Sequence, residues 1–292
     1  MALPALLDTH LLDDEHFAQA YDGVTPEQRA WLKTSIAFLH AAKEWGGPHR
    51  SVRTSEYSGA TLVEVERMSR WAVVLMGRDV ISPVRVVACA SAARLAGVEE
   101  VVAVVLDEQP GEASPLPDPV LAGLELAGVE SVALLSPDQV SQLMAEAVDQ
   151  GEPGVVLALG ELAGAFSAAL GQARHCLKIW REPEMLPLAA WGRASWNWDA
   201  LEFAHPGAEF VVYGEAGDAP GHVRRAGESL EEMIRNPHTA VYLEQQDMEQ
   251  ALASTDRVLG PGCESVWFWP ELSRDFFIHT GRAWARSRPE GE

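Results

Sequence analysis

The chain has 292 residues and a formal net charge of −21. A charge this negative argues against nucleic acid or an anionic membrane as a partner, because both are bound by clustered Lys and Arg. Its 3 cysteines are widely spaced, which supports neither a disulfide framework nor a structural zinc site. The sequence shows no membrane-spanning apolar stretch and no signal peptide, so we expect a cytoplasmic protein, long enough for two globular units.

The first part of the chain is predicted to be helical, over residues 1–50. A helix start is indicated by Thr25 as N-cap, a proline after it and Gln28 at the third helical position. Residues 50–69 are predicted to be irregular or weakly helical. The apolar run 71–75 is the first predicted buried strand.

Residues 82–135 contain one pattern twice: an Ala-rich helical segment, then Leu-Ala-Gly-Val-Glu, then a short apolar run. Gly97 and Gly128 stand where each helix should end, because glycine enters the left-handed conformation without a Cβ clash. The apolar runs 101–105 and 132–135 do not alternate, which is typical of strands covered on both faces. Two such units in succession predict right-handed crossovers, a parallel sheet and an open α/β fold.

The stretch 176–206 differs in composition from the rest of the chain. It has weak periodicity and contains four tryptophans: Trp180, Trp191, Trp196 and Trp198. Aromatic residues are enriched in cores, in ligand clefts and at protein interfaces, so all three roles stay open for these tryptophans. Around this stretch we predict strands at 155–159, 209–213, 240–243 and 266–269, helices from 137 and at 161–173, 228–234 and 247–258, and a polar C-terminal helix.

A glycine turn at Gly77 is followed by a Pro-opened, Ala-rich helix that ends in Ala-Gly-Val-Glu at 96–99. The next helix ends in Leu-Ala-Gly-Val at 126–129, and the helix after the following strand carries Gln139. In this order and spacing, residues 70–143 resemble the cofactor-side core of histidinol dehydrogenase. Shorter matches to the same family lie at 206–209, 236–237, 247–249 and 257–258.

The resemblance implies two open parallel-sheet, Rossmann-like globules, an architecture that histidinol dehydrogenase shares with aldehyde dehydrogenases. It implies one discontinuous domain made of residues 1–79 and 208–292, and an inserted domain at 80–207 that carries the Trp-rich extension. The strands are then expected to form one sheet from 71–75, 209–213 and 240–243, and a second from 101–105, 131–135 and 155–159.

The family's zinc ligands are not matched. The family takes a glutamine and a histidine from one short helix, and the corresponding positions here are Glu232 and Arg235. An arginine cannot ligate zinc. The family's Glu-His acid/base pair would lie in the loop that reads Gly-Pro-Gly-Cys-Glu here, at 260–264. We therefore expect no zinc.

The dinucleotide site is matched only in part. Where the family has paired glycines, this chain has Ser-Pro at 136–137, and a proline offers no amide to a phosphate. Gly77 and Gln139 are the retained candidates for cofactor contact, and Arg78 or Arg85 could supply a cation. NAD is expected to bind weakly or not at all.

The catalytic candidates are Glu209 and Cys263. Glu209 matches a family residue near substrate and could orient an amine, or it could simply meet an arginine at a strand edge. Cys263 could be an activated thiolate, as in aldehyde dehydrogenases, or a small buried residue. Among the histidines, His175 and His205 lie at no metal-type spacing, so we expect no metal ligands.

We therefore interpret the chain as histidinol-dehydrogenase-like, with zinc-dependent histidinol oxidation lost and a small molecule or a partner bound in the cleft between the globules. A homodimer is one such assembly. The alternatives are an active NAD(P)-dependent oxidoreductase with a rebuilt site using Cys263 or Glu209, and a structural or regulatory subunit that uses the Trp-rich segment as its interface.

Overall fold

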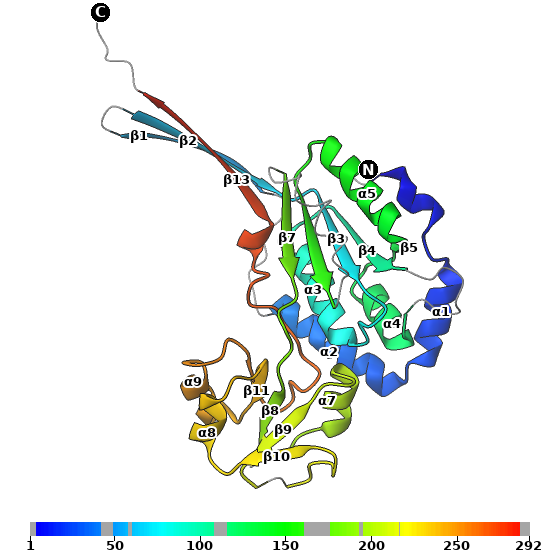
Figure 1. Cartoon of the computed structure of the whole chain (residues 1–292), viewed down its shortest axis with the longest axis vertical. Coiled ribbons are helices and arrows are strands. Elements are labelled where there is room, and N and C mark those ends of the chain that lie inside the picture. The colour runs from blue at the N-terminus through cyan, green and yellow to red at the C-terminus, as the bar shows by residue number, and fades with distance from the viewer. Residues whose placement is uncertain are drawn as a thin grey trace, which may run out of the picture.

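Two five-stranded parallel sheets and one three-stranded antiparallel sheet organise the described part of the chain. One parallel sheet lies above the other in Figure 1, and the antiparallel sheet projects from the body as an arm. None of the helices in the ranges given below is both long and apolar enough to cross a membrane. The computed structural model describes residues 4–41, 49–57, 60–107, 116–160, 176–192, 195–215 and 217–286.

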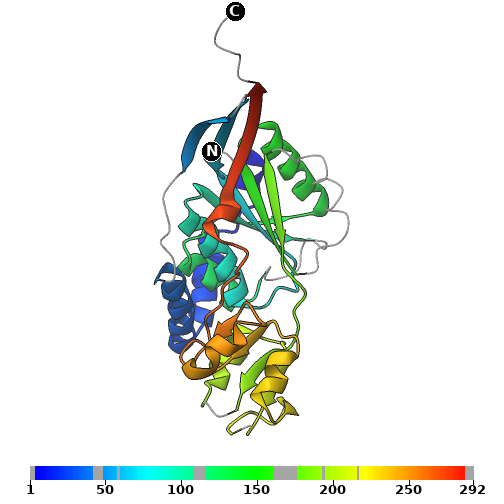
Figure 2. The same ribbon diagram turned by 90° about the vertical axis from the view of Figure 1, so that its left-hand side faces the viewer.

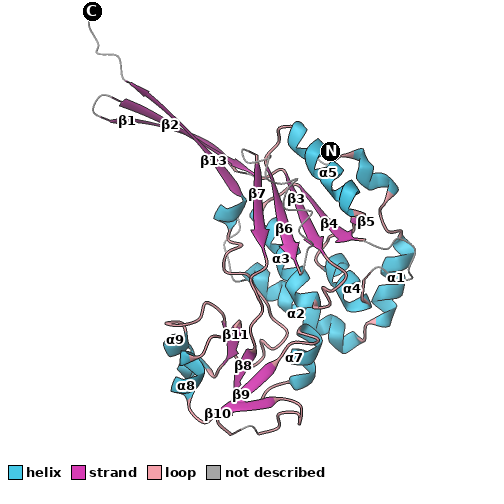
Figure 3. Cartoon of the chain, in the orientation of Figure 1, coloured by secondary structure: helices cyan, strands magenta, loops and turns pink. Residues whose placement is uncertain are grey.

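The upper sheet has the strand order β5-β4-β3-β6-β7, with every neighbouring pair parallel. Helices cover both of its faces (Figure 3): α3 and α4 pack on one face and α5 on the other. Its strands are β3 (Trp71–Met76), β4 (Glu100–Leu106), β5 (Val132–Leu135), β6 (Gly154–Leu159) and β7 (Leu177–Arg181), and its helices are α3 (Pro83–Ala96), α4 (Asp118–Leu126) and α5 (Pro137–Asp149).

The repeat predicted from the sequence is confirmed. Helix α3 begins with Pro83 at its first position and ends at Gly97, whose φ of 97° is left-handed. Gly128, just beyond α4, has a φ of 76°. These glycines let each helix stop and turn at once into the next buried strand.

Helices at the N-terminus cover α3 and α4: α1 (Asp14–Gly23) and α2 (Pro26–Ala41), after a short 3-10 turn, η1 (Ala5–Thr9). The predicted start of α2 is confirmed by a reciprocal cap, because the Thr25 N–H donates to Gln28 Oε1 at 3.0 Å and the Gln28 N–H to Thr25 Oγ1 at 3.2 Å.

The lower sheet has the order β10-β9-β8-β11-β12 and is also parallel. One face packs on α8 and α9, and the other joins the main core together with α7. Its elements are β8 (Leu188–Trp191), α7 (Trp198–Ala204), β9 (Phe210–Tyr213), β10 (Arg224–Gly227), α8 (Leu230–Arg235), β11 (Ala240–Tyr242), η2 (Gln245–Asp247), α9 (Met248–Ala251) and β12 (Val258–Leu259).

The arm corrects two predictions. It consists of β1 (Arg50–Tyr57), β2 (Ala60–Met68) and β13 (Ile278–Arg286), which follows η3 (Arg274–Phe277). Residues 50–69 are therefore not irregular or helical, and no polar helix covers 278–286. Both faces of the arm are largely exposed, so its strands lack the buried apolar run by which a strand is recognised. Figure 2 shows β13 returning along the body to complete the arm.

The expected sheet membership of residues 71–75 was wrong. Strand β3 is the centre of the upper sheet, where Trp71 pairs with Glu100 on one side and Gly154 on the other. The remaining expected groupings are confirmed, because β9 and β11 share the lower sheet while β4, β5 and β6 share the upper. The predicted domain bounds 1–79, 80–207 and 208–292 were based on residues 71–75 pairing with strands of the lower sheet. Strand β3 does not pair with those strands.

Other predictions failed in segments that are held by aromatic packing and do not form the regular helix or strand that was expected. Residues 266–269 are a buried irregular segment, and the helix expected at 247–258 is reduced to η2 and α9. The helix expected at 161–173 lies outside the described residues. The Trp-rich stretch supplies β7, β8 and α7, and all four of its tryptophans are buried, at 6–9% exposure: Trp180, Trp191, Trp196 and Trp198. They pack in the core.

Candidate functional site

A cavity of about 330 Å³ lies between the two parallel sheets and is called the cleft below. The upper part of the molecule contributes Asp79 and Ile81, from the loop after β3, and Arg85 on α3. The lower part contributes residues 185–187, before β8, and 205–209, between α7 and β9. The cleft therefore lies at the carboxyl edge of the upper sheet, where open parallel sheets bind ligands.

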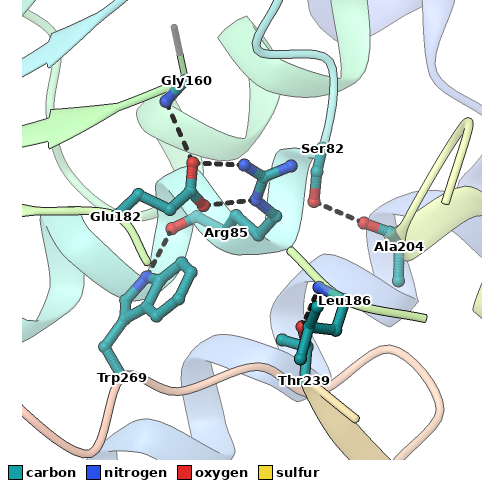
Figure 4. Close-up of polar contacts among 8 residues, drawn as sticks. All are labelled: Ser82, Arg85, Gly160, Glu182, Leu186, Ala204, Thr239 and Trp269. Atoms are coloured by element: carbon teal, nitrogen blue, oxygen red, sulfur yellow. Dashed lines mark hydrogen bonds and ion pairs between the residues drawn. The ribbon is translucent and has the colours of Figure 1, made fainter. Parts of the chain in front are cut away.

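The cation nearest the middle of this edge is already paired. The Arg85 guanidinium donates to both carboxylate oxygens of Glu182, with the Nε–Oε1 distance at 2.6 Å. The Gly160 N–H donates to Glu182 Oε2 at 2.9 Å (Figure 4). The Glu182 side chain is 5% exposed, so this carboxylate is held out of water by a guanidinium and a backbone amide.

A second arginine at the same edge is paired in the same way. Arg78, in the turn after β3, donates from Nη2 to Asp107 Oδ1 at 2.8 Å. Asp107 directly follows β4, and its side chain is 8% exposed. Both cations that the sequence offered to a cofactor phosphate are thus held by carboxylates of the chain.

The two cofactor candidates have structural roles. Gln139 closes a capping box at the start of α5, where its Oε1 accepts from the Ser136 N–H at 2.8 Å. Its Nε2 donates to His10 Nε2 at 3.0 Å. Gly77 lies in the turn after β3, and its carbonyl accepts from the Val80 N–H at 3.2 Å. Both stand at the carboxyl edge of the upper sheet, as expected, but the Gln139 amide is occupied.

The two catalytic candidates do not share a site. Glu209 lies on the wall of the cleft, where its Oε1 accepts from Arg224 Nε at 3.1 Å and Nη2 at 2.9 Å. This is the exposed strand-edge ion pair that the sequence left as one alternative. Cys263 is half-buried and is not among the described residues that line the cleft. Burial raises the pKa of its thiol, which disfavours the thiolate needed for attack.

His205 lines the cleft and was not selected from the sequence. Its Nε2 shares a hydrogen bond of 3.2 Å with the Tyr242 hydroxyl, while Nδ1 has no hydrogen-bond partner among the described residues. Burial, together with the positive charges of Arg85 and Arg257, lowers the pKa of His205 to about 3. The imidazole is therefore neutral at pH 7. No local sequence signal marks it, because the pairing joins residues 37 positions apart.

Arg257 contacts the same tryptophan as His205, is buried, and forms no salt bridge with a carboxylate of the described residues. Its guanidinium stands 4.3 Å from the centre of the Trp267 ring and donates to the carbonyls of Phe268 and Thr239, at 2.9 and 2.8 Å. Burial lowers the pKa of Arg257 to about 10, so it still carries its charge at pH 7. This charge adds to the effects of burial and of Arg85, which lower the pKa of His205.

No family model and no curated protein sequence matches this chain. Among solved structures it is similar to a histidinol dehydrogenase from Elizabethkingia anophelis, with a TM-score of 0.57 and 12% identity over 95% of this chain and 77% of that one. It is also similar to an NAD-dependent benzaldehyde dehydrogenase from Corynebacterium glutamicum, with a TM-score of 0.51 and 11% identity over 94% of this chain and 83% of that one. The chain has the histidinol and aldehyde dehydrogenase fold. At this identity the likeness concerns the fold alone.

The zinc that the resemblance to histidinol dehydrogenase implies does not fit the residues at the matching positions. Arg235 lies at the end of α8, exposed, with its Nη2 2.6 Å from Glu231 Oε1. Glu232 stands in the first turn of the same helix, where its N–H donates to Ser229 Oγ. Among the residues that the structure describes, no group of three or more His, Cys, Asp or Glu side chains could hold a metal ion.

Proposed function

We propose that this protein has kept the histidinol dehydrogenase scaffold, has lost zinc-dependent histidinol oxidation, and binds a small molecule in the cleft between its two parallel sheets. One observation carries the proposal. The cleft lies at the carboxyl edge of the upper sheet, while the side chains that the resemblance assigns to zinc or a dinucleotide are paired within the chain.

The lining of the cleft favours an uncharged or cationic ligand. The Arg85 charge is balanced by Glu182 and the Glu209 charge by Arg224, and Asp79 adds one further acidic side chain to the lining. His205 is neutral at pH 7, so it adds no charge to the lining. With a net charge of −21 on the whole chain, a polyanion would approach against the electrostatic field.

The alternative is an active NAD(P)-dependent oxidoreductase with a rebuilt site. The likeness to an enzyme whose name states NAD dependence favours it, because the upper sheet is of the kind that binds dinucleotides. In that case Glu209 or Cys263 would carry the chemistry. The raised pKa of Cys263 and the ion pair at Glu209 stand against both roles.

A homodimer, a cytoplasmic location and the lack of nucleic-acid and membrane partners stay predictions. The arm is the surface best suited to a second copy, because it exposes Val52, Tyr57 and Trp284 while the tryptophans of the Trp-rich stretch are buried. The molar mass in solution, measured by light scattering, tests for the dimer.

The cleft proposal is tested by thermal-shift screening of the purified chain against imidazoles, other small uncharged and cationic compounds, nucleotides, NAD and NADP. We expect stabilisation by small uncharged or cationic compounds and none by NAD or NADP. Ile81→Trp, which fills the cleft, should abolish the shift, whereas Leu252→Trp, at an exposed position outside the cleft, should leave it unchanged. Stabilisation by NAD or NADP alone would instead favour the oxidoreductase.

A further inference from the structure

The crevice between β3 and β6 is where the strand order of the upper sheet reverses, since the chain runs from β3 to β4 and β5 on one side and then crosses to β6 on the other. Open parallel sheets hold nucleotide phosphates at such a point, with backbone N–H groups and cations. Two groups of this kind face the crevice here. Arg85 reaches it from the first turn of α3, and Gly160 presents its N–H at the end of β6.

Glu182 fills the place between these two groups. Its two oxygens receive the forked N–H donors of Arg85, which is how a guanidinium also binds a phosphate. Its Oε2 receives the Gly160 N–H as well, as a phosphate oxygen would (Figure 4). The backbone of Glu182 is fixed at the end of β7, because its N–H donates to the Ala158 carbonyl at 2.8 Å.

The amide at position 160 is available only because the residue is glycine. Gly160 has a φ of 75°, which L-residues rarely adopt. A Cβ there would lie 2.6 Å from Val80 Cγ2 and 2.7 Å from Asp79 Oδ2. The close approach of this backbone to the loop after β3 brings the N–H to the carboxylate.

We propose that Arg85 and the Gly160 N–H form a phosphate-binding position that Glu182 occupies as an internal anion, and that a phosphate-containing ligand binds there once this carboxylate is removed. A phosphate entering beside the intact Glu182 would meet a buried like charge and a guanidinium whose donors are taken. The position shares Arg85 with the cleft. It is tested with phosphate-containing probes, whereas the proposed function is tested with uncharged and cationic compounds, so the two can fail separately.

The test is isothermal titration of the full chain and its Glu182→Ser variant with inorganic pyrophosphate and with ADP. Ser removes the charge and leaves room for the anion between the two donors. We expect no measurable binding to the parent chain and measurable binding to the variant, at least about tenfold above the detection limit, because the like-charge repulsion is gone. Adding Arg85→Met to Glu182→Ser should abolish the gain.

Glu209→Ser is the matched control, since it makes the same change on the cleft wall, where Glu209 is paired with Arg224. If Glu182→Ser does not fold, Glu182→Ala leaves similar room, and pyrophosphate should raise its melting temperature more than that of the parent. The proposal is overturned if folded Glu182 variants bind no better than the parent, if Glu209→Ser gains equally, or if the parent itself binds ADP tightly.

Discussion

The two parallel sheets have the same architecture and are stabilised by different means. The strands of the upper sheet are 4 to 7 residues long and lie between helices on both faces. The strands of the lower sheet are 2 to 4 residues long, and their packing depends on a cluster of aromatic and polar side chains around Trp267. Buried aliphatic side chains stabilise the upper half, and a few large aromatic and polar side chains stabilise the lower half.

The difference also explains where ligand chemistry can lie. The upper sheet contributes a carboxyl edge whose polar groups are paired within the chain, namely Arg78, Arg85 and Gln139. The lower sheet contributes His205, a neutral group with an unpartnered nitrogen. The cleft takes its lining from both halves, so changes in either half bear on the ligand.

The largest expected effect is that of Trp267→Ala. The residue is fully buried and its ring contacts both Arg257 and His205, so its loss should lower the free energy of unfolding by about 3–5 kcal/mol. Urea denaturation measures this. Trp284→Ala, at the exposed tip of the arm, is the control and should change the value by less than about 1 kcal/mol. A small effect at Trp267 would mean that the short strands alone support the lower half.

The second prediction is a loss of stability in mild acid. An unfolded histidine takes up a proton near its ordinary pKa of 6.5, whereas folded His205 stays neutral down to about pH 3 and folded His279 to about pH 4. The free energy of unfolding should therefore fall as the pH drops below 6.5. The fall due to His279 should end below about pH 4, and the fall due to His205 below about pH 3. Urea unfolding across this range should show it.

For each such histidine the slope approaches about 1.4 kcal/mol per pH unit. Replacing His205 by Phe should remove the contribution of one proton from the measured slope. An unchanged slope in His205→Phe would contradict the neutral imidazole and with it the polarity assigned to the cleft.

A smaller effect is expected of Gln139→Ala. Loss of the capping box at α5 should cost about 0.5–2 kcal/mol, because the Ser136 N–H and His10 lose their hydrogen bonds to the Gln139 side chain. Gln142→Ala, on the exposed side of the same helix, is the control. Any binding of NAD should be equally weak in the parent and in Gln139→Ala. Tight NAD binding that disappears with Gln139 would restore its role as a cofactor residue.

The smallest effect is expected of Glu209→Gln. Its ion pair with Arg224 is exposed to water, so thermal denaturation should show a change below about 1 kcal/mol. A substrate that the protein oxidises with NAD would allow a second measurement. If Glu209→Gln then abolishes that turnover, the carboxylate is catalytic and does more than line the cleft.

The upper half was predicted well because helix ends and buried strands have recognisable local sequence signals. Gly97 and Gly128 mark helix ends, and the apolar runs mark strands that are covered on both faces. The lower half left fewer marks, since the strands at 188–191 and 224–227 are short and lie next to aromatic or polar stretches. In the arm, β1 and β2 lack a buried apolar run, and the pairing of β13 with β2 joins residues more than 200 positions apart, so neither was predicted.

The site was predictable only in its location. Glycine turns and the order of the repeat placed the carboxyl edge correctly, and the arginine in place of a zinc-ligand histidine was visible at position 235. The pairing of Arg85 with Glu182, 97 positions apart, could not be foreseen, because it depends on β7 lying beside β6. The same holds for His205 and Tyr242, whose contact needs the packing of α7 on the lower sheet.

The central claim is that the scaffold persists without zinc-dependent histidinol oxidation. The most direct test incubates the purified chain with histidinol, NAD and zinc, follows the reduced nicotinamide by absorbance, and determines bound zinc by elemental analysis, with a histidinol dehydrogenase as the positive control. The account predicts no reduced nicotinamide and substoichiometric zinc. Turnover that a chelator abolishes, with one zinc held per chain, would contradict it.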